Sequence, residues 1–156
     1  MKRLLDINTW IALAIETHPL HPAARGWYEA APLAAGDLVF CPSTEMGFLR
    51  LVTQAAVMSR CGAAPLTNRE AISYLQGLYA NPALSRVAEP TAMRSLWLQL
   101  ADNTQSAPNT WMDAYLAAFA ISLDAEMVTF DRGFNNYRTA GLNLHLLEAV
   151  PIDKGQ

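Results

Sequence analysis

Four carboxylates stand where short strands end or helices begin. Asp6 and Asp131 each follow an apolar run, in the segments LLDI and VTFDR. Glu45 and Asp113 lie in the first turns of two candidate helices. In a parallel α/β sheet, the carboxyl ends of the strands and the amino ends of the following helices share one edge, where ligand crevices form. Acids from four distant segments can therefore meet in one pocket.

Such a cluster needs a cation, because a buried charge must be paired or bound to a metal. Lys2 and Lys154 are the two lysines of the chain, so no internal lysine supplies that charge. Oxygen ligands favour a hard divalent ion, and we predict Mg²⁺, with Mn²⁺ as a substitute. Any one of the acids alone could instead cap a helix. The apolar flanks of all four favour a shared site.

The elements that would position these acids alternate between short apolar strands and helices. We predict strands over residues 2–5, 37–41, 84–88, 127–130 and 142–147. We predict helices over residues 7–16, 22–31, 44–59, 68–80, 92–101, 111–124 and 132–139. This alternation indicates one α/β domain over residues 1–156. Its sheet is mainly parallel, is covered by helices on both faces and has the last strand at an edge.

The composition excludes several classes of protein. Of the 156 residues, 52% are hydrophobic and 16% are charged, which is too apolar for an intrinsically disordered chain. A net charge of −3 disfavours proteins that hold nucleic acid by bulk positive charge. The two cysteines make neither a disulfide framework nor a zinc site. Asp6 and Asn8 interrupt the first apolar stretch, so we expect no signal peptide, no membrane contact and a cytoplasmic protein.

Longer motifs surround the four acids. They are LLDINTWIAL at 4–13, STEMGFLRLVT at 43–53, MDAYLAAFA at 112–120 and VTFDRGF at 128–134. In this order they resemble the PIN-domain ribonucleases, particularly the VapC-type toxins of bacterial type II toxin–antitoxin systems. Residues 60–108 match no motif that we recognise. The resemblance implies a Mg²⁺-dependent endoribonuclease toxin that cleaves RNA, forms a homodimer and is neutralised by a small cognate antitoxin.

The resemblance also implies a catalytic metal site made of the four acids. Asp6 and Asp113 look most like the direct ligands, and Glu45 and Asp131 complete the site. Three neighbours would orient the carboxylates and the water around the metal: Asn8, Thr110 and Thr129. Thr129 could equally be an ordinary strand threonine.

Two arginines, Arg50 and Arg132, resemble contacts to RNA phosphates. Each could otherwise be a solvated or salt-bridged surface arginine. Trp10 and Trp111 could stack on RNA bases, but the apolar character of their helices favours packing for both.

Two other functions stay open at this point. The same fold could serve as a non-catalytic module that binds RNA or protein, although acids at all four positions favour an enzyme. A small-molecule phosphohydrolase is the second alternative, because Asp6-Ile7-Asn8 is similar to the DxD start of the haloacid dehalogenases. The second Asp of that motif is Asn8 here, and the later lysine of that family has no candidate.

Overall fold

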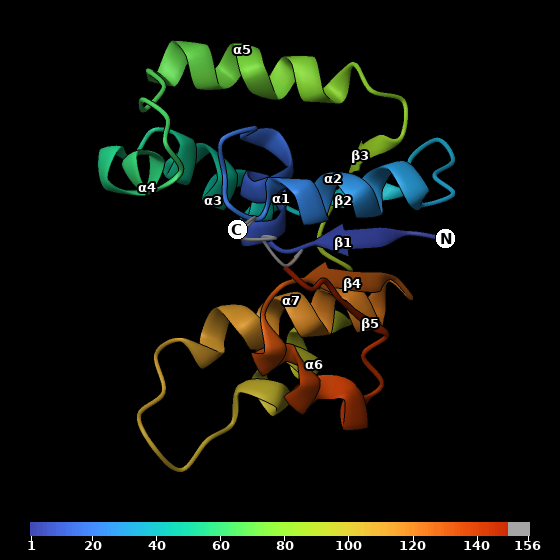
Figure 1. The fold of residues 1–156 in the computed structure, drawn as a ribbon. Coiled ribbons are helices and arrows are strands. Elements are labelled where there is room, and N and C mark those ends of the chain that lie inside the picture. Colours follow the sequence, from blue (N-terminus) through green and yellow to red (C-terminus); the bar gives the residue numbers. More distant parts are fainter. Residues whose placement is uncertain (150–156) are drawn as a thin grey trace, which may run out of the picture.

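The computed structural model describes residues 1–149, in which five short strands form one sheet (Figure 1). The strands are β1 (Arg3–Leu5), β2 (Leu38–Phe40), β3 (Leu84–Arg86), β4 (Glu126–Thr129) and β5 (Leu144–Leu146). Their order is β3-β2-β1-β4-β5, and every neighbouring pair is parallel. The predicted parallel sheet is confirmed, and β5 lies at an edge as expected.

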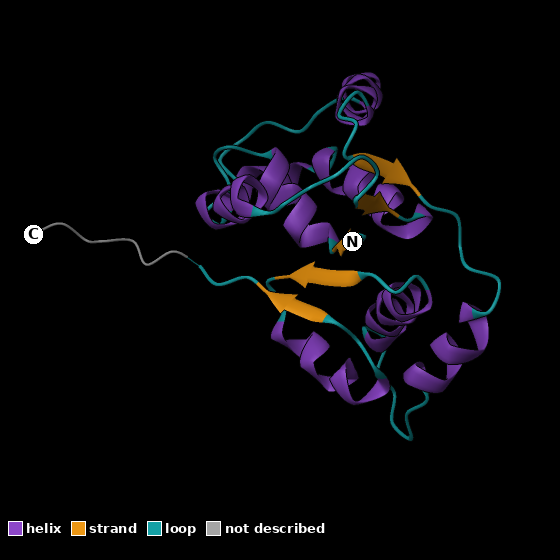
Figure 2. Cartoon of the chain, turned by 90° about the vertical axis from the view of Figure 1, so that its right-hand side faces the viewer, coloured by secondary structure: helices purple, strands orange, loops and turns teal. Residues whose placement is uncertain are grey.

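Helices connect the strands and cover both faces of the sheet. They are α1 (Ile7–Ala14), α2 (His21–Ala30), α3 (Pro42–Val52), α4 (Ala55–Arg60), α5 (Asn68–Tyr79), α6 (Met93–Ala101), α7 (Thr110–Ser122) and the 3₁₀ helix η1 (Arg132–Ala140). In Figure 1, α1, α3 and α5 lie on one side of the strands, and α6 and α7 lie on the other. Figure 2 shows strands between these two groups of helices. No helix among residues 1–149 is long and apolar enough to cross a bilayer.

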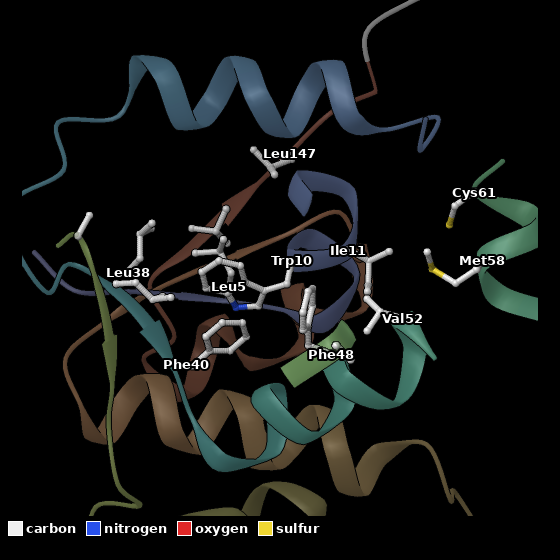
Figure 3. Close-up of a cluster of buried hydrophobic side chains, with 14 residues drawn as sticks. Leu5, Trp10, Ile11, Leu38, Phe40, Phe48, Val52, Met58, Cys61 and Leu147 are labelled. Carbon is white, nitrogen blue, oxygen red and sulfur yellow. The ribbon is translucent and has the colours of Figure 1, made fainter. Parts of the chain in front are cut away.

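Alternate strand residues face two separate cores, because successive side chains of a strand point to opposite faces. Leu5 packs with the core of α1 and α3, whereas Leu4 packs with α6 and α7. In the first core, Trp10 stacks on Phe40 with ring centroids 4.1 Å apart, and Phe48 lies against the same ring (Figure 3). Trp10 is therefore a core residue, as its apolar helix predicts.

The helix predicted over residues 44–59 is two helices, α3 and α4, so that prediction was wrong. The break falls at Thr53, whose hydroxyl donates to the carbonyl oxygens of Leu49 at 2.9 Å and Arg50 at 3.1 Å. A threonine hydroxyl that bonds back to the preceding turn bends or weakens a helix. The next residue, Gln54, has an extended backbone and precedes α4.

Candidate active site

The sheet has a topological switch point between its strands β1 and β4. The chain runs from β1 to β2 and β3 on one side, and then crosses back to β4 on the other side of β1. A crevice forms beyond the carboxyl ends of strands at such a point. Asp6 directly follows β1, and Asp131 lies two residues after β4. Two of the predicted acids thus lie at the edge where the sequence placed them.

Asp6 is fixed by contacts from both strands and from α1. Its backbone N–H donates to the Val128 carbonyl at 3.1 Å, and its Oδ1 accepts from the Ile7 N–H at 2.6 Å. Its Oδ2 accepts from the Thr129 hydroxyl at 2.9 Å. Asp6 is 7% exposed. It therefore caps α1 and also presents a carboxylate to the crevice, so the two alternatives for this residue are compatible.

Thr129 connects two of the acids. Its buried hydroxyl donates to Asp6 Oδ2 and accepts from the backbone N–H of Asp131 at 2.9 Å. Asp131 Oδ1 in turn accepts from the N–H of Gly133 at 2.7 Å and caps η1. These contacts are those expected of a residue that orients a ligand carboxylate.

The charges of Asp113 and Asp131 act on Asp6, and the charge of Asp131 acts on Asp113, so we call these three residues the three-acid cluster. Burial is the main cause that raises the pKa of Asp6 to about 6, and the charges of Asp113 and Asp131 add to it. Hydrogen bonds from Thr129 and Ile7 act in the opposite direction. Burial and the charge of Asp131 also raise the pKa of Asp113. Within residues 1–149, no Lys, Arg or His forms an ion pair with the cluster.

Glu45 is bound to other partners. Its Oε2 accepts a hydrogen bond from the Tyr79 hydroxyl, and its Oε1 accepts from Arg86 Nε at 3.2 Å. The Glu45 side chain is 18% exposed. Burial and the contact with Glu45 raise the pKa of Tyr79, so the phenol stays protonated and donates. The structure thus brings together three of the predicted acids and joins the fourth to Tyr79 and Arg86.

Tyr79 and Arg86 lie in the segment 60–108 and were not predicted as site residues. Arg86 is the last residue of β3, and β3 runs parallel to β2. The rule that located Asp6 at a strand end could therefore have found Arg86. Tyr79 ends α5, and its contact with Glu45 depends on how α5 packs against α3, which no local pattern reports.

The other predicted residues form no hydrogen bond or ion pair with the acids in the described part of the chain through their side chains. Asn8 is exposed on α1, and Thr110 is half-buried as the first residue of α7. Arg50 and Arg132 are both exposed, and in the described part of the chain neither forms an ion pair. Arg132 directly follows Asp131 in the chain and is the first residue of η1.

An apolar groove of about 620 Å³ lies between α3 and α7. Ile7, the residue after Asp6, lines it together with Met46, Trp111 and Met112. These last three are 71%, 52% and 44% exposed. Ser43 Oγ donates to Met112 Sδ at 3.0 Å between the two helices. Trp111, predicted to pack, contacts Trp97 edge-on with ring centroids 6.2 Å apart and is half-exposed in this groove.

The donors of the three-acid cluster fit a hard divalent cation, because they are carboxylate oxygens without a cationic partner in the described chain. Among residues 1–149, no three His, Cys, Asp or Glu side chains are gathered tightly enough to form a ready-made metal centre. Mg²⁺ does not require one, since it usually binds one or two carboxylates and keeps several waters. Asp6 and Asp113 are the candidates for direct contact, with Asp131 beside them.

Comparison with known proteins identifies the family of the chain. The PIN domain family matches residues 3–140. Ribonuclease VapC41 of Mycobacterium tuberculosis is 41% identical over 145 residues, which cover 92% of this chain and 97% of that relative.

Two solved structures share the fold at 16% identity. A chain of VapBC2 from Rickettsia felis, bound to a DNA fragment from its promoter, matches with a TM-score of 0.64. The match covers 95% of this chain and 100% of that chain. VapC20 of Mycobacterium tuberculosis, a sarcin-ricin loop cleaving toxin, matches with a TM-score of 0.61. The match covers 90% of this chain and 96% of the VapC20 chain. With the family match and the 41% identity, these findings establish that the chain belongs to the PIN-domain family, in its VapC branch.

Proposed function

We propose that this protein is a Mg²⁺-dependent endoribonuclease that acts in the cytoplasm as the toxin of a toxin–antitoxin pair. The observation that carries the proposal is the three-acid cluster at the switch point of the sheet, which has no cationic partner among residues 1–149. The 41% identity to a ribonuclease over 92% of the chain supports RNA as the substrate.

The chain's residues would prepare the site for hydrolysis of a phosphodiester bond. Asp6 and Asp113 would hold the cation, with Asp131 beside them. When bound, Mg²⁺ would lower the pKa of a water and offset negative charge on the phosphate and the leaving oxygen. Thr129 holds the Asp6 carboxylate in one orientation, so this ligand needs little reorganisation.

The cation and a few arginines would bind the RNA phosphates. The net charge of −3 disfavours binding that depends on bulk positive charge along nucleic acid. Arg132, next to Asp131, and Arg50, on the wall of the apolar groove, are the two candidates. This arrangement favours a short structured RNA over a long nonspecific one.

The apolar groove is the surface that we assign to the antitoxin. Exposed Met46, Trp111 and Met112 would be covered by an apolar segment of the partner, which would then block access to the neighbouring acids. The Rickettsia felis neighbour is a VapBC assembly, which supports a partner of this class. Co-expression with the product of an adjacent small gene tests this. An adjacent product that neither co-purifies nor suppresses toxicity would contradict it.

A homodimer is part of the same proposal. Ile72 on α5 is exposed beside a second groove of about 410 Å³, which Leu49 and Ala71 also line. Light scattering across micromolar concentrations tests this, and a monomer throughout would contradict it.

The activity is tested with three substrates in parallel. Purified protein is incubated with end-labelled structured RNA, with DNA of the same sequence and with p-nitrophenyl phosphate, each in Mg²⁺ and in EDTA. We expect internal cleavage of the RNA only, in Mg²⁺ only, and none by Asp6→Asn. Hydrolysis of the small ester without RNA cleavage would favour the phosphohydrolase. RNA binding without cleavage would favour the non-catalytic module.

A further inference from the structure

Both carboxylate oxygens of Glu45 are occupied by donors from the middle of the chain. The Tyr79 hydroxyl donates to Oε2, and Arg86 Nε donates to Oε1 at 3.2 Å. These donors lie 34 and 41 residues beyond Glu45, at the ends of α5 and β3. We call Glu45, Tyr79 and Arg86 the Glu45 clamp.

The two donors of the clamp are anchored to the same core residue. The Tyr79 ring lies against fully buried Phe40, with centroids 6.0 Å apart and an angle of 55° between the rings. Arg86 is the register partner of Phe40 in the pairing of β3 with β2. The hydroxyl and the guanidinium group therefore start from fixed points and converge on one carboxylate. The Arg86 side chain is 53% exposed, so the fold fixes its backbone and the position of the Tyr79 ring, and the ion pair itself lies at the surface.

The charge of Glu45 is offset, whereas the charge of the three-acid cluster is not. Arg86 forms an ion pair with Glu45. Within the described residues, no cationic side chain pairs with Asp6, Asp113 or Asp131. A divalent cation at the cluster would therefore have three carboxylates without a cationic partner, whereas the Glu45 carboxylate already has one.

We propose that Tyr79 and Arg86 are positioning residues that keep Glu45 out of direct contact with the cation. The inference rests on the proposed function, which supplies the cation. Affinity for a divalent ion rises with the number of charged ligands. The clamp therefore holds the affinity of the site below the value that four free carboxylates would give. Release of the clamp lets Glu45 join the three-acid cluster and tightens binding.

The test measures the affinity of the full chain for Mn²⁺ alone by titration calorimetry. We expect Glu45→Gln to change the dissociation constant by less than about threefold, whereas Asp6→Asn weakens binding more than about tenfold. Tyr79→Phe combined with Arg86→Gln should tighten binding by about three- to tenfold. Adding Glu45→Gln to that pair should cancel the gain.

Two matched controls come from the same chain. Tyr74→Phe removes a hydroxyl from the same helix that donates to the Ala14 carbonyl at 2.8 Å. Arg25→Gln breaks an exposed ion pair with Glu29. Neither contact involves the site, so neither change should alter the affinity for Mn²⁺.

Several outcomes would overturn the clamp and leave the proposed function standing. Glu45→Gln could weaken Mn²⁺ binding as much as Asp6→Asn, which would make Glu45 a direct ligand. The double clamp variant could bind Mn²⁺ as the wild type does. If Arg86→Gln prevents folding, Tyr79→Phe keeps the partly buried ring, and it should still tighten binding only when Glu45 is present. A wild-type protein that binds no Mn²⁺ would instead overturn the metal-dependent function, and the role of the clamp with it.

Discussion

The hydroxyl of Thr129 donates to Asp6 Oδ2 at 2.9 Å and so ties the end of β4 to the residue that follows β1. Through its second contact, with the Asp131 backbone, one buried side chain joins two acids of the cluster. The site is thereby organised by the two strands at the switch point. A substitution at Thr129 should consequently weaken metal binding more than the same substitution at another fully buried threonine nearby.

Thr129→Val keeps the shape of the side chain and removes the hydroxyl. It leaves Asp6 Oδ2 and the Asp131 N–H without this partner, at a cost of about 1–3 kcal/mol in the free energy of unfolding. Loss of an orienting contact should also weaken Mn²⁺ binding roughly 10- to 100-fold. Urea unfolding and Mn²⁺ titration of the same sample measure both effects.

Thr9→Val is the matched control for this substitution. Thr9 is also fully buried, and its hydroxyl donates to the Val128 carbonyl at 3.2 Å without touching an acid. It should lose stability but keep its affinity for Mn²⁺. Equal affinities in the two valine variants would show that Thr129 does not orient Asp6.

The raised pKa of Asp6 predicts a stability change with pH in metal-free protein. In the folded chain Asp6 keeps its proton up to a pH of about 6, whereas in the unfolded chain it releases it near 3.8. The folded state therefore binds the proton more tightly, and stability falls as the pH rises from about 4 to about 6. The difference between the two pKa values of Asp6 corresponds to about 3 kcal/mol in the free energy of unfolding. Melting curves in EDTA should show this slope, and Asp6→Asn should reduce it to the smaller part that comes from Asp113, whose pKa is also raised.

Asp37 should change stability with pH in the direction opposite to Asp6. The Ala34 N–H and the amino terminus hold the pKa of its carboxyl below the usual range, and Arg3 adds to this. The stability that Asp37 contributes is present above a pH of about 4 and is lost as the pH falls further. A melting profile that rises steadily from pH 3 to pH 7 would contradict the part assigned to Asp6.

Replacement by alanine should change the free energy of unfolding in opposite directions at two helical glycines. At Gly47, on α3, an added Cβ would overlap the Ile7 Cδ1 atom, and Ile7 holds Asp6 through its N–H. Gly47→Ala should therefore lower the free energy of unfolding by about 1–2 kcal/mol. At Gly77, on α5, an added Cβ meets no atom within 4 Å. Gly77→Ala should raise stability by about 0.5–1 kcal/mol. Stabilisation by both changes would refute the close packing of α3 on Ile7.

Arg132→Ala tests the phosphate contact. One charge-assisted hydrogen bond to phosphate is worth about 1.5–3 kcal/mol, so RNA binding should weaken by roughly ten- to a hundredfold. Affinity for Mg²⁺ should stay the same or improve slightly, because a nearby positive charge is removed. A variant with normal RNA affinity and a lower metal-free melting temperature would show that Arg132 stabilises the acids instead.

Much of the site follows from local sequence, because strand ends and first helical turns carry recognisable patterns. Asp6 and Asp131 follow apolar runs, and the parallel sheet brings both to one edge. The break at Thr53 was not predicted, because the bond from its hydroxyl to the preceding turn leaves the apolar pattern unchanged. Of the two partners of Glu45, Arg86 ends a strand and could have been predicted, whereas Tyr79 could not, since it reaches Glu45 only through the packing of α5.

The three-acid cluster is proposed to hold the cation that the protein needs to hydrolyse RNA. The most direct measurement is RNA cleavage by Asp113→Asn over a Mg²⁺ titration, beside wild type and Asp124→Asn. Asp124 has a φ of 52° just beyond α7, a conformation that asparagine also adopts. We predict that wild type and Asp124→Asn cleave in Mg²⁺ and stop in EDTA, whereas Asp113→Asn stays folded and does not cleave. RNA cleavage that persists in excess EDTA, or in the Asp113→Asn variant, would contradict this account.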